Sequence, residues 1–165
     1  MIKNTHISAL LLMILTIAGA CTKPAEEAKT IHDTLRNGKW RQTSGTVRFQ
    51  GQNGVDTTGN YFADGVPACI KDDYIVFKEN FSGVVEDADS TCGIGDPRER
   101  PFTWEVMKAE SKLNIFNARR NFQTSSVYGE IVSMSDGNLS IRYTVYEQFT
   151  PGDIDTLTYT NEYSK

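Results

Sequence analysis

Two cysteines frame the segment that most constrains how this chain can fold. Between Cys69 and Cys92 the sequence predicts two strands, Tyr74–Lys78 and Gly83–Asp87, separated by a reversal. Aromatic and β-branched residues fill the strands, while Asn, Ser and Gly lie at the reversal, as is typical of a β-hairpin. The segment therefore predicts antiparallel β-structure with one cysteine on each side of it.

The register of this hairpin predicts a disulfide. Directly opposed residues of an antiparallel pair have numbers that sum to a constant. The centre of the segment lies between Asn80 and Phe81, so the register that sets Phe77 near Val84 also brings the two cysteines together at the open end of the hairpin. Closing a loop of this size stabilises a fold by about 3 kcal/mol in the chain-entropy model.

The N-terminus resembles the signal of a bacterial lipoprotein. Lys3 precedes the apolar run Ile7–Ala18, which is too short to span a bilayer, since spanning takes roughly 20 apolar residues. The run leads into Ile17–Cys21, which resembles a lipobox with Ala18 in place of the usual Leu. The resemblance implies cleavage before Cys21 and acylation of that residue, whose acyl chains anchor the protein to a membrane.

This prediction divides the chain into a signal peptide (1–20), a lipid-anchored tether (21–34) and one domain (35–165). Removing 20 of the 165 residues leaves 145, with 16 Lys and Arg against 21 Asp and Glu, a net charge of −5. An acidic chain without a basic run disfavours nucleic acid as a partner. We expect this protein to lie in the cell envelope, anchored by its lipid to the outer membrane. The sequence does not decide between the periplasmic and the surface face of that membrane. The two remaining cysteines suit an oxidising compartment.

Strands and turns alternate after Leu35. Sequential hairpins with period-two patterning predict an antiparallel meander, and closing it into a barrel removes its open edges. We therefore predict an all-β fold, an eight-stranded antiparallel up-and-down barrel, with a sandwich of the same strands as the alternative. The predicted strands are 39–50, 74–78, 83–87, 102–106, 113–117, 127–134, 139–146 and 155–163, with irregular loops at 51–65 and 89–101.

Several motifs resemble those of lipocalins. Gly38-Lys39-Trp40 matches the Gly-x-Trp that opens the first lipocalin strand, and Cys69–Phe77 resembles a block of bacterial lipocalin-like envelope lipoproteins. Lipocalins carry a late arginine that stacks on this tryptophan, and the only late arginine here is Arg142. The resemblance covers about residues 35–160 and implies an anchored lipocalin-like barrel without naming a ligand. Further similar positions are Gly83, Cys92, 102–104, 113–115, 130–134, Leu139 and 157–160.

The sequence contains few residues in patterns that are typical of catalytic sites. After cleavage the only histidine is His32 in the tether, so a Ser-His-Asp or Cys-His system would need its base there. Asp72 and Asp73 are adjacent in a predicted extended segment and therefore face opposite ways. Asp87-Ala-Asp89-Ser has the alternating oxygens of a calcium loop but lacks its glycine and closing glutamate. We predict no enzyme, no cofactor and no metal.

The aromatic residues provide the candidate ligand site. The strand alternation places Phe77, Trp104, Tyr143 and Tyr159 on inward faces, where they either line a cavity for an apolar ligand or fill a small barrel. We expect a non-catalytic, lipid-anchored envelope protein that binds a small hydrophobic or amphipathic molecule. The alternative is a protein-interaction or inhibitor module that binds an unknown partner protein through the rim loops 51–65 and 89–101.

Overall fold

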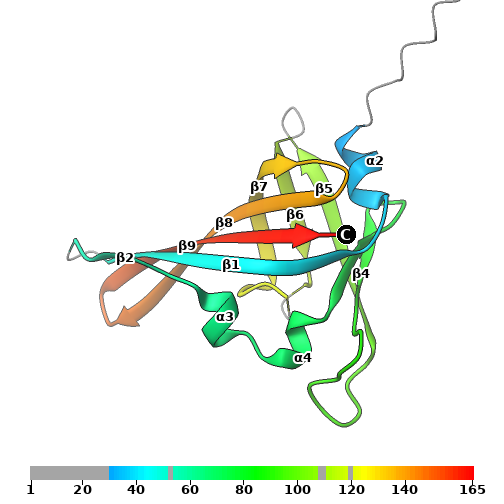
Figure 1. Ribbon diagram of the computed structural model, residues 1–165. Helices are drawn as coiled ribbons and strands as arrows, with labels where there is room; N and C mark the ends of the chain where they lie inside the picture. The colour runs from blue at the N-terminus through cyan, green and yellow to red at the C-terminus, as the bar shows by residue number, and fades with distance from the viewer. Residues whose placement is uncertain (1–29, 52–53, 108–110, 119–120) are drawn as a thin grey trace, which may run out of the picture.

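The computed structural model describes residues 30–51, 54–107, 111–118 and 121–165. In these residues most of the chain lies in strands, and the helices are short (Figure 1). The helices are α2 (Ile31–Arg36), α3 (Tyr61–Gly65) and α4 (Ala68–Lys71). The strands are β1 (Trp40–Gln50), β2 (Asp56–Gly59), β3 (Tyr74–Phe77), β4 (Ser82–Glu86), β5 (Glu99–Met107), β6 (Lys112–Phe116), β7 (Ser126–Met134), β8 (Asn138–Thr150) and β9 (Asp153–Ser164).

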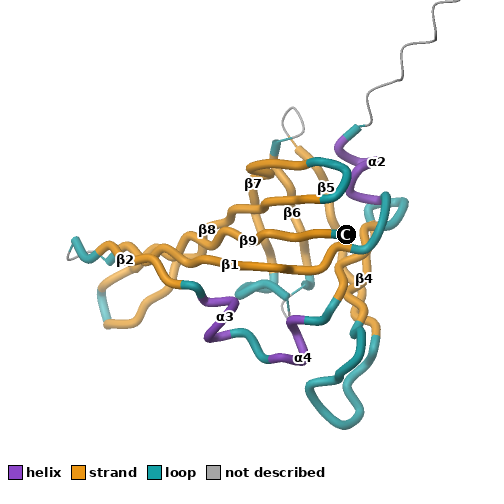
Figure 2. The backbone as a smooth tube through the Cα atoms, viewed as in Figure 1, coloured by secondary structure: helices purple, strands orange, loops and turns teal. Residues whose placement is uncertain are grey.

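Eight of these strands close into a barrel. From β3 to β9 each strand pairs antiparallel with the next, and β9 pairs with β1 along most of its length (Figure 2). The ring is completed where β1 meets β3 through two residue pairs, Trp40 with Ile75 and Arg41 with Tyr74. The predicted eight-stranded up-and-down barrel is confirmed, and the sandwich alternative is not the observed fold.

The remaining strand, β2, extends one side of the barrel. It pairs with the last four residues of β1, and beyond Tyr143 strand β8 pairs only with β9. Strands β2, β1, β9 and β8 therefore project past the rest of the barrel, at the left of Figure 1. The prediction of an irregular loop over 51–65 was wrong, because Thr57 and Thr58 join the sheet and α3 follows them.

The central hairpin forms, but its register differs by one residue from the prediction. Phe77 lies opposite Gly83, and Val84 opposite Val76. Asn80 and Phe81 both adopt left-handed backbone angles, with φ of 56° and 57°, and the reversal is centred on Asn80 instead of between these two residues. The absence of a side chain at Gly83 leaves room for the ring of Phe102 on the adjacent strand.

Helix α2 covers one end of the barrel. It starts with a capping box between Thr30 and Asp33, and it takes in residues 31–34 of the predicted tether. The buried Trp40 donates a hydrogen bond from Nε1 to the carbonyl oxygen of Leu35 on this helix, at 2.8 Å. The cation over the Trp40 ring is Lys165, with Nζ 4.6 Å from the ring centroid.

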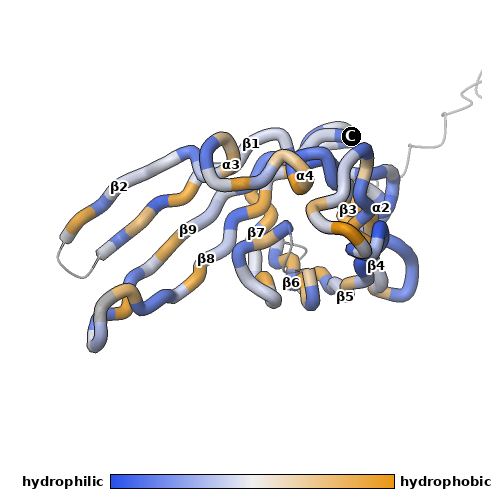
Figure 3. The backbone as a smooth tube through the Cα atoms, turned by 90° about the horizontal axis from the view of Figure 1, so that it is seen from below, coloured by the Kyte–Doolittle hydropathy of each residue, from blue (hydrophilic) through white to orange (hydrophobic). Residues whose placement is uncertain are grey.

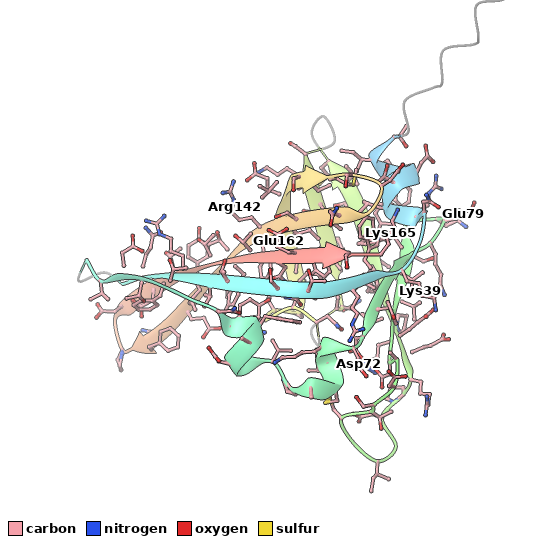
Figure 4. The ribbon with its side chains drawn as sticks, in the orientation of Figure 1. Lys39, Asp72, Glu79, Arg142, Glu162 and Lys165 are labelled. Atoms are coloured by element: carbon pink, nitrogen blue, oxygen red, sulfur yellow. A yellow bond between two sulfur atoms is a disulfide. The ribbon has the colours of Figure 1, made fainter. Side chains whose placement is uncertain are left out.

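Arg142 does not take the place of the lipocalin arginine. Its Nη2 lies 2.9 Å from Glu130 Oε2 on the neighbouring strand, and Figure 4 shows its side chain pointing away from the barrel. The side chain that lies over the ring of Trp40 is instead that of the last lysine of the chain, Lys165.

Polar and apolar residues alternate along β8 and β9, as Figure 3 shows. The apolar side chains of the alternation form one core with those of β3 to β7. Within the ranges given above, no helix has the length and apolar character needed to cross a bilayer.

Candidate functional site

The four aromatic residues predicted to line a ligand cavity are all buried. Phe77, Trp104 and Tyr143 are 2% exposed and Tyr159 is 8% exposed. They do not line one shared cavity among the pockets found in the described residues, but form two separate aromatic pairs. The inward orientation predicted from the alternation is therefore correct. The two pairs differ in the residues that they pack against.

Phe77 and Trp104 pack one end of the barrel. Their ring centroids are 5.2 Å apart in a T-shaped arrangement, and Phe102 approaches Phe77 edge-on at 5.6 Å. Trp104 donates a hydrogen bond from Nε1 to the carbonyl oxygen of Ser82 at 2.7 Å. These three rings therefore fill this end of the barrel as part of its core, as expected for a small barrel filled by side chains.

Tyr143 and Tyr159 form the second pair, and a third tyrosine closes over it. Their rings are stacked at 5.2 Å, and Tyr61 meets Tyr159 edge-on at 5.1 Å. Tyr61 belongs to α3, which packs against β1 and lies beside it in Figure 2. Sequence reasoning missed Tyr61 because it assigned 51–65 to a loop.

Buried amides connect these tyrosines. Tyr61 Oη donates to Asn161 Oδ1 at 2.5 Å, and Gln42 Nε2 donates to Tyr61 Oη at 3.0 Å. Asn161, which is completely buried, donates from Nδ2 to Tyr163 Oη at 3.1 Å. Polar groups inside the barrel thus find partners among themselves, which fixes the position of the rings.

Burial keeps the phenols of this network neutral. Removal from water raises the pKa of Tyr61, and its hydrogen bonds with Gln42 and Asn161 offset only part of that rise. Burial likewise raises the pKa of Tyr143 and Tyr163 far above the ordinary tyrosine value. These hydroxyls therefore serve as hydrogen-bond groups and not as bases at neutral pH.

A cleft opens beside this network, at the mouth of the barrel next to α3 and α4. Its volume is about 290 Å³, just below the range of roughly 300–1,000 Å³ that is usual for ligand pockets. β1, the α3–α4 connection, α4 and the β6–β7 connection each contribute to it. The residues that line it are Gln42, Gly65, Val66, Pro67, Ile70, Asn121, Phe122 and Gln123.

The cleft is lined by both amide-bearing and apolar side chains. Gln42, Asn121 and Gln123 supply amides, and the ring of Phe122 packs edge-on against Tyr143 at 5.8 Å. The Gln123 backbone N–H lies 3.4 Å from Tyr143 Oη, so the cleft wall is tied to the buried tyrosines. A second, larger hollow of about 570 Å³ lies around the Arg142 and Glu130 pair, whose side chains are exposed.

Buried charges lie beside Asn121. Asn121 donates from Nδ2 to Asp73 Oδ2 at 3.3 Å. Arg100 bonds the carboxylate of Asp87, and its Nη2 lies 3.6 Å from Asp73 Oδ2. The carboxylates of Asp73 and Asp87 are fully buried, so this cluster joins the start of β3, the end of β4 and β5 inside the protein.

A covalent link braces α4 beside the cleft. The predicted Cys69–Cys92 disulfide is confirmed, with Cα atoms 5.2 Å apart. Cys69 lies in α4 and Cys92 in the β4–β5 connection, so the bridge ties a helix to a loop and does not extend the strand ladder as expected. It holds α4, which carries Ile70, against the rest of the fold.

Asp72, which Figure 4 labels near α4, strengthens the same link through hydrogen bonds. Its Oδ2 accepts from the backbone N–H groups of Asp89 and Ser90, each at 3.1 Å. Burial alone would raise the pKa of Asp72, but these bonds and that from the Ser90 hydroxyl lower it overall. Asp72 and the buried Asp73 therefore act in different places, as their adjacency predicted.

The other candidate chemical groups are engaged in packing. His32 lies on α2 with its ring 5.4 Å from Trp104 and 6.0 Å from Phe81. Asp87, from the segment compared with a calcium loop, bonds Arg100. Among the residues described, no three His, Cys, Asp or Glu side chains are grouped so as to hold a metal ion. The predicted anchor, Cys21, lies outside the described residues.

No family model matches this chain, and no curated protein matches it.

Proposed function

We propose that this protein is a non-catalytic binding protein that holds a small amphipathic molecule in the cleft beside α3 and α4. The observation that carries the proposal is the mixed lining of the cleft, in which the amides of Gln42, Asn121 and Gln123 occur together with Val66, Pro67 and Ile70. The amides offer hydrogen bonds to the polar portion of an amphipathic molecule, and the three apolar side chains offer a surface for its apolar portion. The expected ligand position among the four inward aromatic residues moves to the cleft, because those rings pack against one another.

We propose further that Cys21 carries a lipid anchor and that the protein acts at the cell envelope. The lipobox-like segment Ile17–Cys21 and the disulfide, which suits an oxidising compartment, support this. The described chain begins at α2, on a different side of the barrel from α3 and α4 (Figure 1). This arrangement leaves the cleft accessible while the N-terminus is held at a membrane.

The absence of catalysis is also part of the proposal. His32 packs against two aromatic rings, and the buried carboxylates of Asp73 and Asp87 share Arg100. The buried tyrosines have raised pKa values and act as neutral hydrogen-bond groups.

Native mass spectrometry tests this function. The chain from Cys21 to Lys165, with Cys21→Ser, is purified gently from its own host, and a retained small molecule is expected. Ile70→Trp fills the cleft and should release that molecule, whereas Val132→Trp, at a position 48% exposed outside the cleft, should retain it. A bare mass for the unsubstituted protein, or retention by both variants, would contradict the proposal.

A protein-interaction role is the second candidate, favoured by the apolar tips of the β1–β2 and β8–β9 hairpins. Val55, Phe149 and Ile154 are between 52% and 61% exposed there, and the Phe149 ring lies 6.2 Å from that of Phe49. Exposed apolar groups gathered at one place mark interaction sites. Capture of one defined envelope protein by the wild type, but not by Phe149→Ser, would support this candidate over the first.

A further inference from the structure

We infer that the hollow around Arg142 and Glu130, on the outer face of the barrel, is a second binding site and that it takes a glycan chain. This site is separate from the cleft beside α3 and α4, so the inference goes beyond the proposed function and does not depend on it. The observation that carries it is the presence of two exposed tyrosine rings and an ion pair in one hollow.

The hollow lies where two neighbouring strands separate. The pairing of β7 with β8 runs as far as Gly129 and Tyr143, and beyond this pair β8 continues alongside β9. Side chains from both strands line the hollow, whose volume is about 570 Å³, and Figure 4 shows that of Arg142 on this outer face. Those that the inference uses are Tyr128 and Glu130 of β7 and Arg142, Thr144 and Tyr146 of β8.

The two tyrosines offer ring surface to a ligand. Tyr128 is 69% exposed and Tyr146 is 70% exposed, and the edge-on contact of Tyr128 with Phe116, at 5.9 Å, holds one of the two rings. Tyrosine provides a large, rigid contact area at a low cost in conformational entropy. The face of an aromatic ring is partially negative and attracts the weakly positive C–H groups on the apolar face of a sugar ring. These rings therefore suit the stacking of sugar units.

The ion pair beside the rings offers donors and acceptors together. Arg142 Nη2 lies 2.9 Å from Glu130 Oε2, and Lys112 lies opposite Glu130 on the neighbouring strand. The hydrogen bond from Arg142 and the charge of Lys112 hold the pKa of Glu130 below its ordinary value, so this carboxylate is ionised at neutral pH. A guanidinium has five N–H donors and a carboxylate has two acceptor oxygens. Such a pair can donate to one hydroxyl and accept from the next, which matches the adjacent hydroxyls of a sugar.

The mixture of rings and charges favours a glycan over other occupants. A purely apolar ligand would remove the half-exposed side chains of Arg142 and Glu130 from water without replacing their hydrogen bonds, which is unfavourable. A peptide strand added to the edge of β8 would bind mainly through main-chain hydrogen bonds and would give the two tyrosine rings no role. The hydroxyls of Thr144 and Thr158, 3.4 Å apart, extend the polar surface along the hollow.

Calorimetry with four oligosaccharides tests the inference, using the chain from Cys21 to Lys165 with Cys21→Ser. The probes are maltohexaose, cellohexaose, xylohexaose and mannohexaose, all of which have adjacent hydroxyls. We expect at least one of them to bind with a Kd below about 1 mM. Treatment of that probe with periodate, which cleaves the bond between carbons that carry adjacent hydroxyls and opens the ring, should abolish binding. This arm needs no variant of the site.

Substitutions in the hollow provide the second arm. Tyr128→Ala and Tyr146→Ala should each raise the Kd at least about tenfold, because each removes a stacking surface. Phe149→Ala is the matched control, since this ring is 61% exposed but lies outside the hollow, and it should leave the Kd unchanged. Binding of none of the four probes, or an equal loss of affinity in Phe149→Ala, would overturn the inference. Either result leaves the proposed function standing, because the Ile70→Trp variant tests the cleft separately.

Discussion

The ring of Tyr61 lies against the backbone of Gly45, where a β-carbon would come within 2.6 Å of ring atom Cε1. Gly45 sits on the inward face of β1, and Tyr61 enters the barrel from α3 above it. Because Gly45 has no side chain, the ring of Tyr61 can pack against this point of the strand. The Tyr61 hydroxyl then completes the hydrogen-bond network beside the cleft.

Gly45→Ala should destabilise the protein by about 1–3 kcal/mol, the usual cost of adding a methyl group to a packed site. The added carbon would displace Tyr61 and with it the hydrogen bond to Asn161. Denaturant unfolding measures the loss. Gly59→Ala, on the neighbouring strand β2 with nothing within 4 Å, is the matched control and should change little. Equal effects of the two substitutions would show that Tyr61 does not depend on Gly45.

Alkaline pH should destabilise the fold. Burial raises the pKa of Tyr143, Tyr163 and Tyr61, whereas an unfolded tyrosine ionises near its ordinary value of 10.0. Below that value both states hold the proton and stability is unaffected. Above it the unfolded state releases protons that the folded state keeps, so the free energy of unfolding falls.

Melting temperatures measured from about pH 8 to about pH 11.5 should therefore be level at first and decline above about pH 10. The decline should be shallower in Tyr163→Phe, which removes one completely buried phenol. Tyrosinate absorbance that develops fully near pH 10 while the protein remains folded would show that these hydroxyls are accessible.

Substitution of Arg100 in the buried charge cluster should be severe. Arg100→Met removes the guanidinium that bonds Asp87 and lies 3.6 Å from Asp73 Oδ2, and breaking a buried pair in this way costs about 3–5 kcal/mol. Arg142→Met breaks the exposed pair with Glu130 and should have little effect, because water screens that pair. Unfolding curves of the two variants provide the comparison, and similar midpoints would refute the structural role of Arg100.

Loss of the disulfide should weaken both the fold and the cleft. The bridge closes a loop with a sequence separation of 23, so Cys69→Ser with Cys92→Ser should lower the free energy of unfolding by about 3 kcal/mol. Wild-type protein treated with a reductant should match the double variant. Because α4 loses its covalent brace, retention of a small molecule in native mass spectrometry should fall as well, and an unchanged unfolding midpoint would contradict the prediction.

The barrel was predictable because the pattern that specifies each strand lies within the strand's own sequence. Leu139, Ile141 and Tyr143 alternate with polar residues, and in the structure all three are buried on one face. Period-two alternation reports which side of a strand faces the core, whatever its partners are. The Cys69–Cys92 bridge was predictable for a related reason, since both cysteines flank one hairpin and a one-residue change of register still leaves them close.

The register and the ends of the sheet were not predictable in the same way. The turn at Asn80 and Phe81 takes left-handed angles that a bulky residue such as Phe81 rarely adopts. Thr57 and Thr58 lie in a stretch rich in turn residues, and they become a strand only because the edge of β1 is available beside them. Both outcomes depend on a neighbouring chain segment and not on local preference.

The sequence by itself determined the alternation, the number of barrel strands, the inward positions of Phe77, Trp104, Tyr143 and Tyr159, and the disulfide. Only the tertiary structure decided that these rings fill the barrel and that the cleft lies elsewhere. Gln42, Ile70 and Asn121 are far apart in the chain, and no period relates them. They meet because barrel closure brings β1, α4 and the β6–β7 connection together, and such a meeting is set by the packing of the whole domain.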